Sequence, residues 1–298
     1  MASEQLQVII NALRNAPALD QPTVQQQRDN FEQGSALRPL PPDVRTEPVD
    51  AGGVPAEWVT IEGNAAAPVA LFLHGGGYCI GSIATHRLWA ADLARAAGGR
   101  VLVIDYRLAP EHPHPAALDD AVAAYRWLLA QGVAPNTTVI HGDSAGGGLT
   151  AATLLALRDA GEPLPAAAVM VSPWLDLTCS SGSFQHNVET DCVLTQHNLS
   201  MWANMYAGED AGAPLVSPLH GDLSGLPQLL IQVGTAELLL DDSTQFAERA
   251  KAAGVDVTLD VWDDMLHIWP IFAWMLPEGQ QAIDRAAAYI KERVAVHA

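Results

Sequence analysis

One serine in this chain stands in a setting that favours nucleophilic chemistry. Residues 142–146 have the sequence Gly-Asp-Ser-Ala-Gly, with a β-branched run before Ser144 and a helix-forming stretch after it. A Gly-x-Ser-x-Gly segment between strand and helix is typical of a sharp turn that pushes the serine hydroxyl into a cleft. The two glycines leave room for neighbouring backbone where side chains would clash. The pattern therefore indicates Ser144 as a candidate nucleophile.

A serine hydroxyl is a weak nucleophile at neutral pH and needs a base within hydrogen-bond distance. Histidine suits this role because its pKa lies near the working pH. The chain has 10 histidines, and His267 is favoured because it follows an alternating strand, Ser144 and an acidic loop. The order serine, carboxylate, histidine is the one expected on an α/β-hydrolase sheet. No pair of histidines has metal-ligand spacing, so we expect no metal site.

The acidic loop, residues 234–242, would supply the carboxylate that orients the imidazole. Glu237 lies three residues past the glycine that ends the preceding strand, and Asp241 is its rival. Asp242 is better explained as the cap of a helix over Thr244–Ala253. Either of the first two candidates could instead be a solvated loop carboxylate.

A glycine loop follows an earlier apolar run, as His74-Gly75-Gly76-Gly77. Consecutive glycines expose backbone N–H groups that can approach a substrate closely and stabilise a developing oxyanion. The loop has neither the Lys-Ser/Thr ending of a P-loop nor the spacing of a dinucleotide fingerprint. Cys79, close to this loop, lacks the elbow context of Ser144 and is interpreted as a small buried residue.

These residues need a sheet to hold them in place. Short apolar runs alternate with helical stretches, which predicts a mainly parallel sheet covered by helices on both faces. The predicted strands are 69–73, 101–104, 137–140, 167–171 and 229–233, with an antiparallel pair at 44–49 and 58–62 and a half-exposed strand at 255–262. The predicted helices between them are 88–97, 118–130 and 147–157, and a last amphipathic helix covers 278–294.

Two segments do not follow this alternation of strands and helices. Residues 1–43 are largely helical, with a second helix from about Pro22 to Gln33, and residues 179–216 contain a helix at Gln196–Tyr206 but no strand. We expect the two segments to form a helical cap over a catalytic domain of residues 44–178 and 217–298. The alternative is that the 196–206 helix simply packs on the sheet.

Composition excludes several classes of function. The 34 acidic against 15 basic residues give a net charge of −19, which disfavours nucleic acids and anionic membranes as partners. No apolar run approaches the roughly 18 residues of a membrane span, and Met1–Glu4 shows no secretory signal. The three cysteines form no C-x-x-C pair, so we expect a cytoplasmic protein. The alternating strand at 255–262 could pair two copies into a homodimer.

Several motifs together resemble the hormone-sensitive-lipase-like carboxylesterases, also called bacterial family IV. They are His74-Gly-Gly-Gly-Tyr78, Asp105-Tyr-Arg-Leu-Ala-Pro-Glu111, Gly142-Asp-Ser-Ala-Gly-Gly147, Ser172-Pro-Trp174 and Ser217-Pro-Leu219. The resemblance runs from about residue 44 to the end, with the motifs in the family's order and separation. It implies an α/β-hydrolase fold with a helical cap, and lipase-like hydrolysis of short-chain carboxylic esters without a cofactor.

Carried over by position, the resemblance makes Ser144 the nucleophile and His267 the base. The oxyanion hole would be formed by the N–H groups of Gly76, Gly77 and Ala145. Many members have Asp where this chain has Glu237, followed by a leucine and a second Asp that match Leu239 and Asp241. The identity of the acid therefore stays open between Glu237 and Asp241.

The sequence thus predicts a serine carboxylesterase that acts on a small-molecule ester through an acyl-enzyme. Five aromatic side chains near the glycine loop and in the cap are candidates for the substrate pocket, although each could equally pack in the core: Tyr78, Trp89, Trp174, Trp202 and Tyr206. The same machinery could open a lactone or cut an amide or carbamate. A non-catalytic small-molecule receptor is a further alternative, against which the retained His267 argues.

Overall fold

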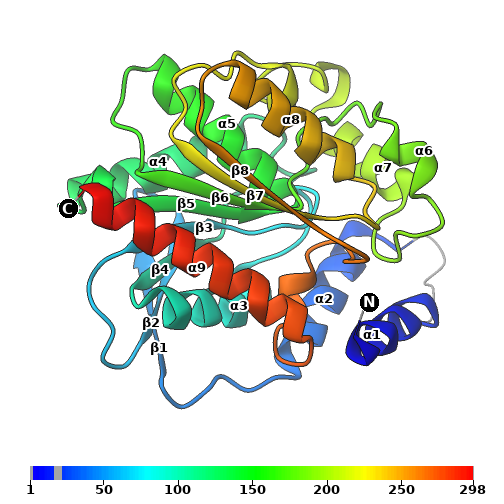
Figure 1. Ribbon diagram of the computed structural model, residues 1–298, viewed down its shortest axis with the longest axis horizontal. Helices are drawn as coiled ribbons and strands as arrows, with labels where there is room; N and C mark the ends of the chain where they lie inside the picture. The colour runs from blue at the N-terminus through cyan, green and yellow to red at the C-terminus, as the bar shows by residue number, and fades with distance from the viewer. Residues whose placement is uncertain (1–2, 17–21, 298) are drawn as a thin grey trace.

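The computed structural model describes residues 3–16 and 22–297, and within them one sheet of eight strands crosses the molecule (Figure 1). Its order is β1-β2-β4-β3-β5-β6-β7-β8. The strands are β1 Val44–Asp50, β2 Pro55–Ile61, β3 Val69–Leu73, β4 Arg100–Ile104, β5 Thr138–Asp143, β6 Ala167–Val171, β7 Gln228–Gly234 and β8 Val257–Trp262. Strands β1 and β2 pair antiparallel and β2 joins β4 antiparallel, whereas every pairing from β4 to β8 is parallel. The α/β-hydrolase sheet expected from the sequence is confirmed.

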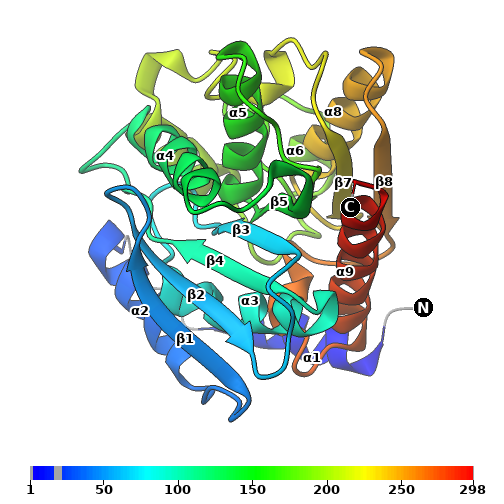
Figure 2. The same ribbon diagram turned by 90° about the vertical axis from the view of Figure 1, so that its left-hand side faces the viewer.

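Helices cover both faces of this sheet (Figures 1 and 2). They are α1 Glu4–Arg14, α2 Val24–Ala36, α3 Ile83–Ala97, α4 Ala116–Ala130, α5 Ala145–Asp159, α6 Ser183–His186, α7 Gln196–Tyr206, α8 Leu240–Ala252 and α9 Pro277–His297. Short 3-10 turns lie at η1 Pro135–Thr137, η2 Gly208–Asp210, η3 Pro218–His220 and η4 Trp269–Phe272. Helices α4, α5 and α8 pack on one face, and α3 and α9 on the other. Within the described residues, no helix combines the length and apolarity needed to cross a bilayer.

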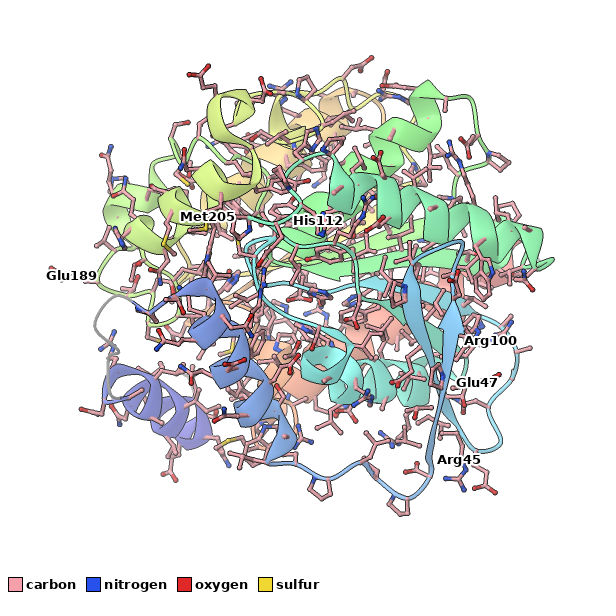
Figure 3. The ribbon with its side chains drawn as sticks, turned by 180° about the vertical axis from the view of Figure 1, so that it is seen from behind. Arg45, Glu47, Arg100, His112, Glu189 and Met205 are labelled. Carbon is pink, nitrogen blue, oxygen red and sulfur yellow. The ribbon has the colours of Figure 1, made fainter. Side chains whose placement is uncertain are left out.

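The outer antiparallel strand carries charge toward solvent. Arg45 and Glu47 lie on β1 at the edge of the sheet, and Arg100 opens β4 nearby (Figure 3). The guanidinium of Arg100 lies 4.2 Å from the ring centre of Trp58, which shields the end of the strand pair. Charged side chains of this kind protect an open sheet edge from pairing with other chains.

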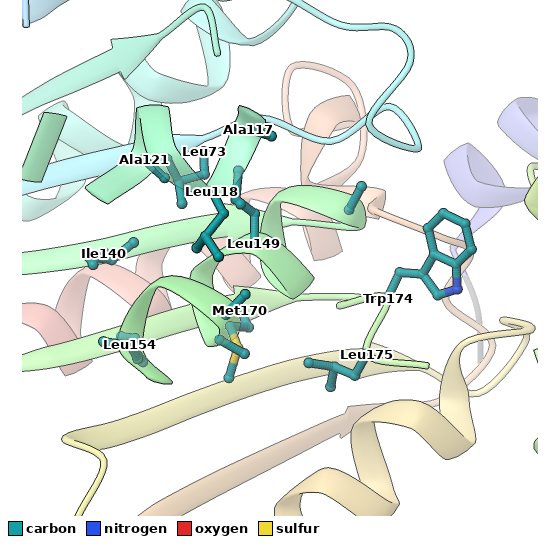
Figure 4. Close-up of a cluster of buried hydrophobic side chains, with 14 of the residues drawn as sticks. Leu73, Ala117, Leu118, Ala121, Ile140, Leu149, Leu154, Met170, Trp174 and Leu175 are labelled. Atoms are coloured by element: carbon teal, nitrogen blue, oxygen red, sulfur yellow. The ribbon is translucent and has the colours of Figure 1, made fainter. Parts of the chain in front are cut away.

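The core follows from strand alternation, since neighbouring side chains of a strand point to opposite faces. Leu71 and Leu73 of β3 join the cluster under α4 and α5, whereas Phe72 joins the cluster under α3 and α9. Figure 4 shows Leu73 and Leu149 together in the first of these clusters. Both faces of the central strands are therefore buried, as their continuous apolar runs predict.

Several helices begin earlier than the sequence suggests. Helix α3 begins at Ile83, where the Thr85 hydroxyl accepts from the Ser82 N–H at 2.9 Å and donates to the Ser82 carbonyl oxygen at 2.8 Å. Helix α8 begins at Leu240, so Asp242 lies within its first turn. The prediction of Asp242 as a helix cap is wrong, and its carboxylate is fully buried instead.

Candidate active site

Ser144 occupies a sharp turn between β5 and α5. Its backbone has φ 51° and ψ −122°, a conformation that a non-glycine residue seldom adopts. A Cβ at Gly142 would lie 2.1 Å from the Gly146 carbonyl oxygen, and one at Gly146 would lie 1.9 Å from that of Leu73. Only glycine fits at these two positions, and the serine hydroxyl is held at the carboxyl edge of the sheet as a result.

A continuous hydrogen-bond chain joins three residues that are far apart in the sequence. The Ser144 hydroxyl lies 2.9 Å from His267 Nε2, and His267 Nδ1 lies 2.8 Å from Glu237 Oε2. Ser144 follows β5, Glu237 follows β7, and His267 lies in the loop after β8. The imidazole and the carboxylate are almost completely buried, and the contact with the Glu237 carboxylate places the imidazole proton on Nδ1.

The rival carboxylates have other partners. Asp241 accepts a hydrogen bond from the Ser183 N–H at 2.8 Å, at the start of α6. Asp242 accepts from the N–H groups of Leu175 and Asp176, each at 2.9 Å. Among the described residues, Glu237 is the carboxylate that touches the His267 ring.

Burial and charge set the protonation of the pair. Burial alone would lower the pKa of His267, but the hydrogen bond and charge of Glu237, with Asp191 and Asp143 further away, outweigh it and raise this pKa above its ordinary value. Burial raises the pKa of Glu237, against the opposing hydrogen bonds from His267, Ser172 and Gly234. A charged carboxylate beside the ring favours the imidazolium, which is what a proton acceptor at this position requires.

The glycine loop lies beside Ser144 and is held there by a hydrogen bond to a buried carboxylate. The Gly75 N–H donates to the Asp143 carboxylate at 3.1 Å, and Asp143 directly precedes Ser144. Gly76 has φ 121°, and a Cβ there would lie 2.2 Å from the Ile80 carbonyl oxygen. No acceptor among the described residues is recorded for the N–H groups of Gly76 and Gly77. The Ala145 N–H opens α5, where helical N–H groups have no partner within the helix.

A cavity of about 760 Å³ opens above Ser144 and His267. Its walls are largely apolar and come from α1, α2, the glycine loop, α3, the 193–202 region and η4. Trp89 and Trp202, two of the predicted pocket residues, line this cavity.

The other three aromatic candidates do not line it. Tyr78 stacks on Tyr206 with ring centres 3.8 Å apart, and Trp174 lies 6.2 Å from Tyr78. All three are buried behind the glycine loop. The prediction that Tyr78, Trp174 and Tyr206 shape the pocket is therefore corrected to core packing, the alternative that the sequence left open.

Two side chains that the sequence analysis did not assign to the site, Ser172 and Asp191, form hydrogen bonds to Glu237 and to the neighbouring Leu238. The Ser172 hydroxyl donates to Glu237 Oε1 at 2.7 Å and accepts from the Ile268 N–H at 3.1 Å. Asp191, in the segment after α6, accepts from the Leu238 N–H at 2.9 Å. Ser172 stands in the Ser-Pro-Trp motif, which was available as a signal, whereas nothing local marks Asp191.

Known proteins share this fold. A family model described as the alpha/beta hydrolase fold matches residues 70–271. An acetyl-hydrolase of Streptomyces hygroscopicus is 48% identical over 244 residues, which are 82% of this chain and 81% of that protein. An esterase of Acinetobacter venetianus is 38% identical over 288 residues, 96% of this chain and 90% of that protein. The crystal structure of an esterase from the bacterial hormone-sensitive lipase family matches with a TM-score of 0.96 and 48% identity, covering 99% of both chains.

Proposed function

The chain belongs to the α/β-hydrolase family, among its hormone-sensitive-lipase-like carboxylesterases, and on that premise we propose that Ser144, His267 and Glu237 are its catalytic triad. The protein is a carboxylic ester hydrolase. The observation that carries the assignment of residues is the unbroken chain of hydrogen bonds from the serine hydroxyl to the buried carboxylate.

In the first half of the reaction, the Ser144 oxygen attacks the ester carbonyl carbon while its proton passes to His267 Nε2. The carbonyl oxygen becomes an oxyanion, which the N–H groups of Gly76, Gly77 and Ala145 would stabilise by about 3 kcal/mol each. Collapse of this intermediate breaks the bond to the alcohol oxygen. The alcohol leaves with the proton from His267, and an acyl-enzyme remains.

In the second half, a water molecule gives a proton to His267 Nε2 and attacks the acyl carbon. Collapse returns the proton to Ser144 and releases the carboxylic acid. Glu237 keeps its charge throughout, orients the ring and stabilises the imidazolium in both halves. No cofactor enters any step.

Short acyl chains are the proposed preference. The apolar walls of the cavity bound the space around the ester, and a relative that is 48% identical bears the name acetyl-hydrolase. Lactones, amides and carbamates are not favoured by the relatives, which are esterases and acetyl-hydrolases.

Residues 1–43 and 179–216 are proposed to act as a cap over this cavity. Leu13 and Phe31 from the first segment, and Leu194 and Trp202 from the second, line the same cavity as Ser144. Removal of residues 1–36 is expected to raise KM for p-nitrophenyl butyrate, and an unchanged KM in a folded product would reject the cap. Pairing of two copies through the outer edge of β8, where Val261 is exposed, is proposed as well and is tested by light scattering.

Replacement of Ser144 with Ala tests the whole assignment. Hydrolysis of p-nitrophenyl butyrate is expected to fall by about 10³-fold or more, because the residual rate depends on binding and oxyanion donors alone. A fluorophosphonate probe should label the parent enzyme at Ser144 and leave the variant unlabelled. A variant that retains a near-normal rate would move the nucleophile elsewhere.

A further inference from the structure

Arg38 differs from every other arginine of the described residues. Each of the others donates through its guanidinium to a carboxylate or a backbone carbonyl, or forms an ion pair with a carboxylate. For Arg38, no hydrogen bond or ion pair of the guanidinium is found in this part of the chain. Its recorded side-chain contact is the ring of Trp274, whose centre lies 5.0 Å from the guanidinium carbon.

Arg38 and Trp274, over which its guanidinium lies, both line the cavity that holds Ser144 and His267. Among the described residues, no Asp or Glu lines that cavity, although the chain has 34 acidic and 15 basic residues. Arg38 is therefore the one permanent charge in an otherwise apolar and neutral wall. Partial burial lowers the pKa of Arg38, and the negative charge of Asp92, which does not line the cavity, opposes this shift. An arginine stays charged in proteins in either case.

Asp92 and the Trp274 ring are the neighbours of this cation, and neither one forms a hydrogen bond or an ion pair with the guanidinium. A half-buried guanidinium without acceptors has lost part of its hydration and keeps its planar fork of donors available. That fork fits a carboxylate or a similar oxyanion in a two-point contact, and charge-assisted hydrogen bonds of this type are about twice as strong as neutral ones. Stacking on Trp274 leaves the guanidinium edge, where the donors lie, free to bind.

We propose that the preferred substrates of this enzyme are esters that carry a second, anionic group, which pairs with Arg38 while the ester carbonyl lies at Ser144. The inference rests on the proposed function and narrows its substrate class. The anionic group can belong to the acid or to the alcohol half of the ester, since both halves share the cavity.

Two matched pairs of esters test this. In the first, 4-nitrophenyl hydrogen adipate carries a carboxylate on the acyl side, and its methyl ester is the neutral partner. In the second, 4-acetoxybenzoate carries a carboxylate on the alcohol side, and methyl 4-acetoxybenzoate is the neutral partner. The quantity compared is the ratio of kcat/KM for the anionic ester to kcat/KM for the neutral one, in the parent enzyme and in Arg38→Gln, Arg38→Glu and Lys291→Gln. Lys291 is an exposed residue of α9 and controls for the loss of one positive charge.

Arg38→Gln is expected to lower this ratio by about 10-fold or more in at least one pair, mainly through KM, with the neutral ester changed by less than about twofold. Arg38→Glu should lower it further, and Lys291→Gln should leave it within about twofold. The difference in this ratio between the parent enzyme and Arg38→Gln should become smaller at about 0.5 M NaCl, because salt screens a partly exposed ion pair.

A ratio unchanged in both pairs, or lowered equally by Lys291→Gln, would overturn the role of Arg38. The neutral esters separate this failure from failure of the proposed function. If the parent enzyme hydrolyses them and only the ratio is insensitive, the esterase assignment stands and the anionic class is rejected. If the parent enzyme hydrolyses neither partner, the proposed function itself fails.

Discussion

At the residue scale, three strained backbone positions lie where the proposed chemistry occurs. Ser144, Ser172 and Ile268 all have positive φ, at 51°, 48° and 48°. Ser144 is a member of the proposed triad, Ser172 donates to Glu237, and Ile268 follows His267. Strain of this kind costs of order 1–3 kcal/mol per residue. The fold therefore holds these residues in place against a local preference, which keeps the hydroxyl, imidazole and carboxylate aligned.

The pH dependence of kcat/KM tests which carboxylate acts. His267 must be neutral to accept a proton, so activity is lost as pH falls through its pKa, which lies above the ordinary histidine value. The acid limb of the profile should therefore lie above about pH 6.5. Glu237→Gln removes the charge that raises this pKa and should move the limb to lower pH while kcat falls by about 10³-fold. Asp241→Asn should change both much less, and the reverse ranking would make Asp241 the acid.

Ser172 gives a second prediction at this scale, as a positioning residue. Its hydroxyl joins the Glu237 carboxylate to the backbone of Ile268, directly after the catalytic histidine. Ser172→Ala should lower kcat by about 5-fold, the equivalent of one buried hydrogen bond of about 1 kcal/mol, with KM within about twofold. Ser243 is the matched control because it is equally buried and its hydroxyl has no partner. Equal losses in steady-state kinetics for both alanine variants would show that Ser172 has no specific role.

At the scale of elements, helix α2 is joined to the glycine loop through one side chain. Arg28 donates to the carbonyl oxygens of Cys79 and Ala109 and forms a two-point ion pair with Glu111. The pair raises the pKa of Arg28 and lowers that of Glu111 to about 2. Both carbonyls belong to loops beside the site, so the position of α2 and the shape of the oxyanion loop depend on each other.

Arg28→Gln should therefore reduce stability and catalysis together. Loss of several charge-assisted hydrogen bonds to a half-buried side chain is expected to lower Tm by about 3–8 °C and kcat severalfold. Arg45→Gln is the comparison. Arg45 of β1 forms an exposed ion pair with Glu62, so this substitution should change Tm by less than about 2 °C. Thermal unfolding followed by circular dichroism, with p-nitrophenyl butyrate kinetics, measures both effects. A drop in Tm without any change in kcat would show that Arg28 contributes to stability and not to catalysis.

At the scale of the whole molecule, the sequence predicted what local patterns encode and missed what only tertiary contacts decide. The elbow around Ser144 and the parallel strands that precede Ser144 and His267 follow from short motifs and apolar runs. Asp242 was misassigned because the two N–H groups that donate to its carboxylate lie in the loop after β6, 66 and 67 residues away. Tryptophan and tyrosine counts likewise do not tell which aromatic faces the cavity, which depends on packing between distant elements.

The cavity is the property of the whole molecule that decides substrate length, and Gly34 offers a way to change it. Gly34 lies in α2, lines the cavity, and has no heavy atom within 4 Å of an added Cβ. Gly34→Phe should fill part of the space and lower kcat/KM for p-nitrophenyl octanoate relative to acetate by about 10-fold or more, since the ring displaces the distal acyl carbons. Gly34→Ala is the control, expected to keep the chain-length profile and to stabilise the helix by about 1 kcal/mol. Equal losses on all chain lengths would instead indicate that the ring disturbs Ser144 or the glycine loop, and acyl chains would then extend along another wall of the cavity.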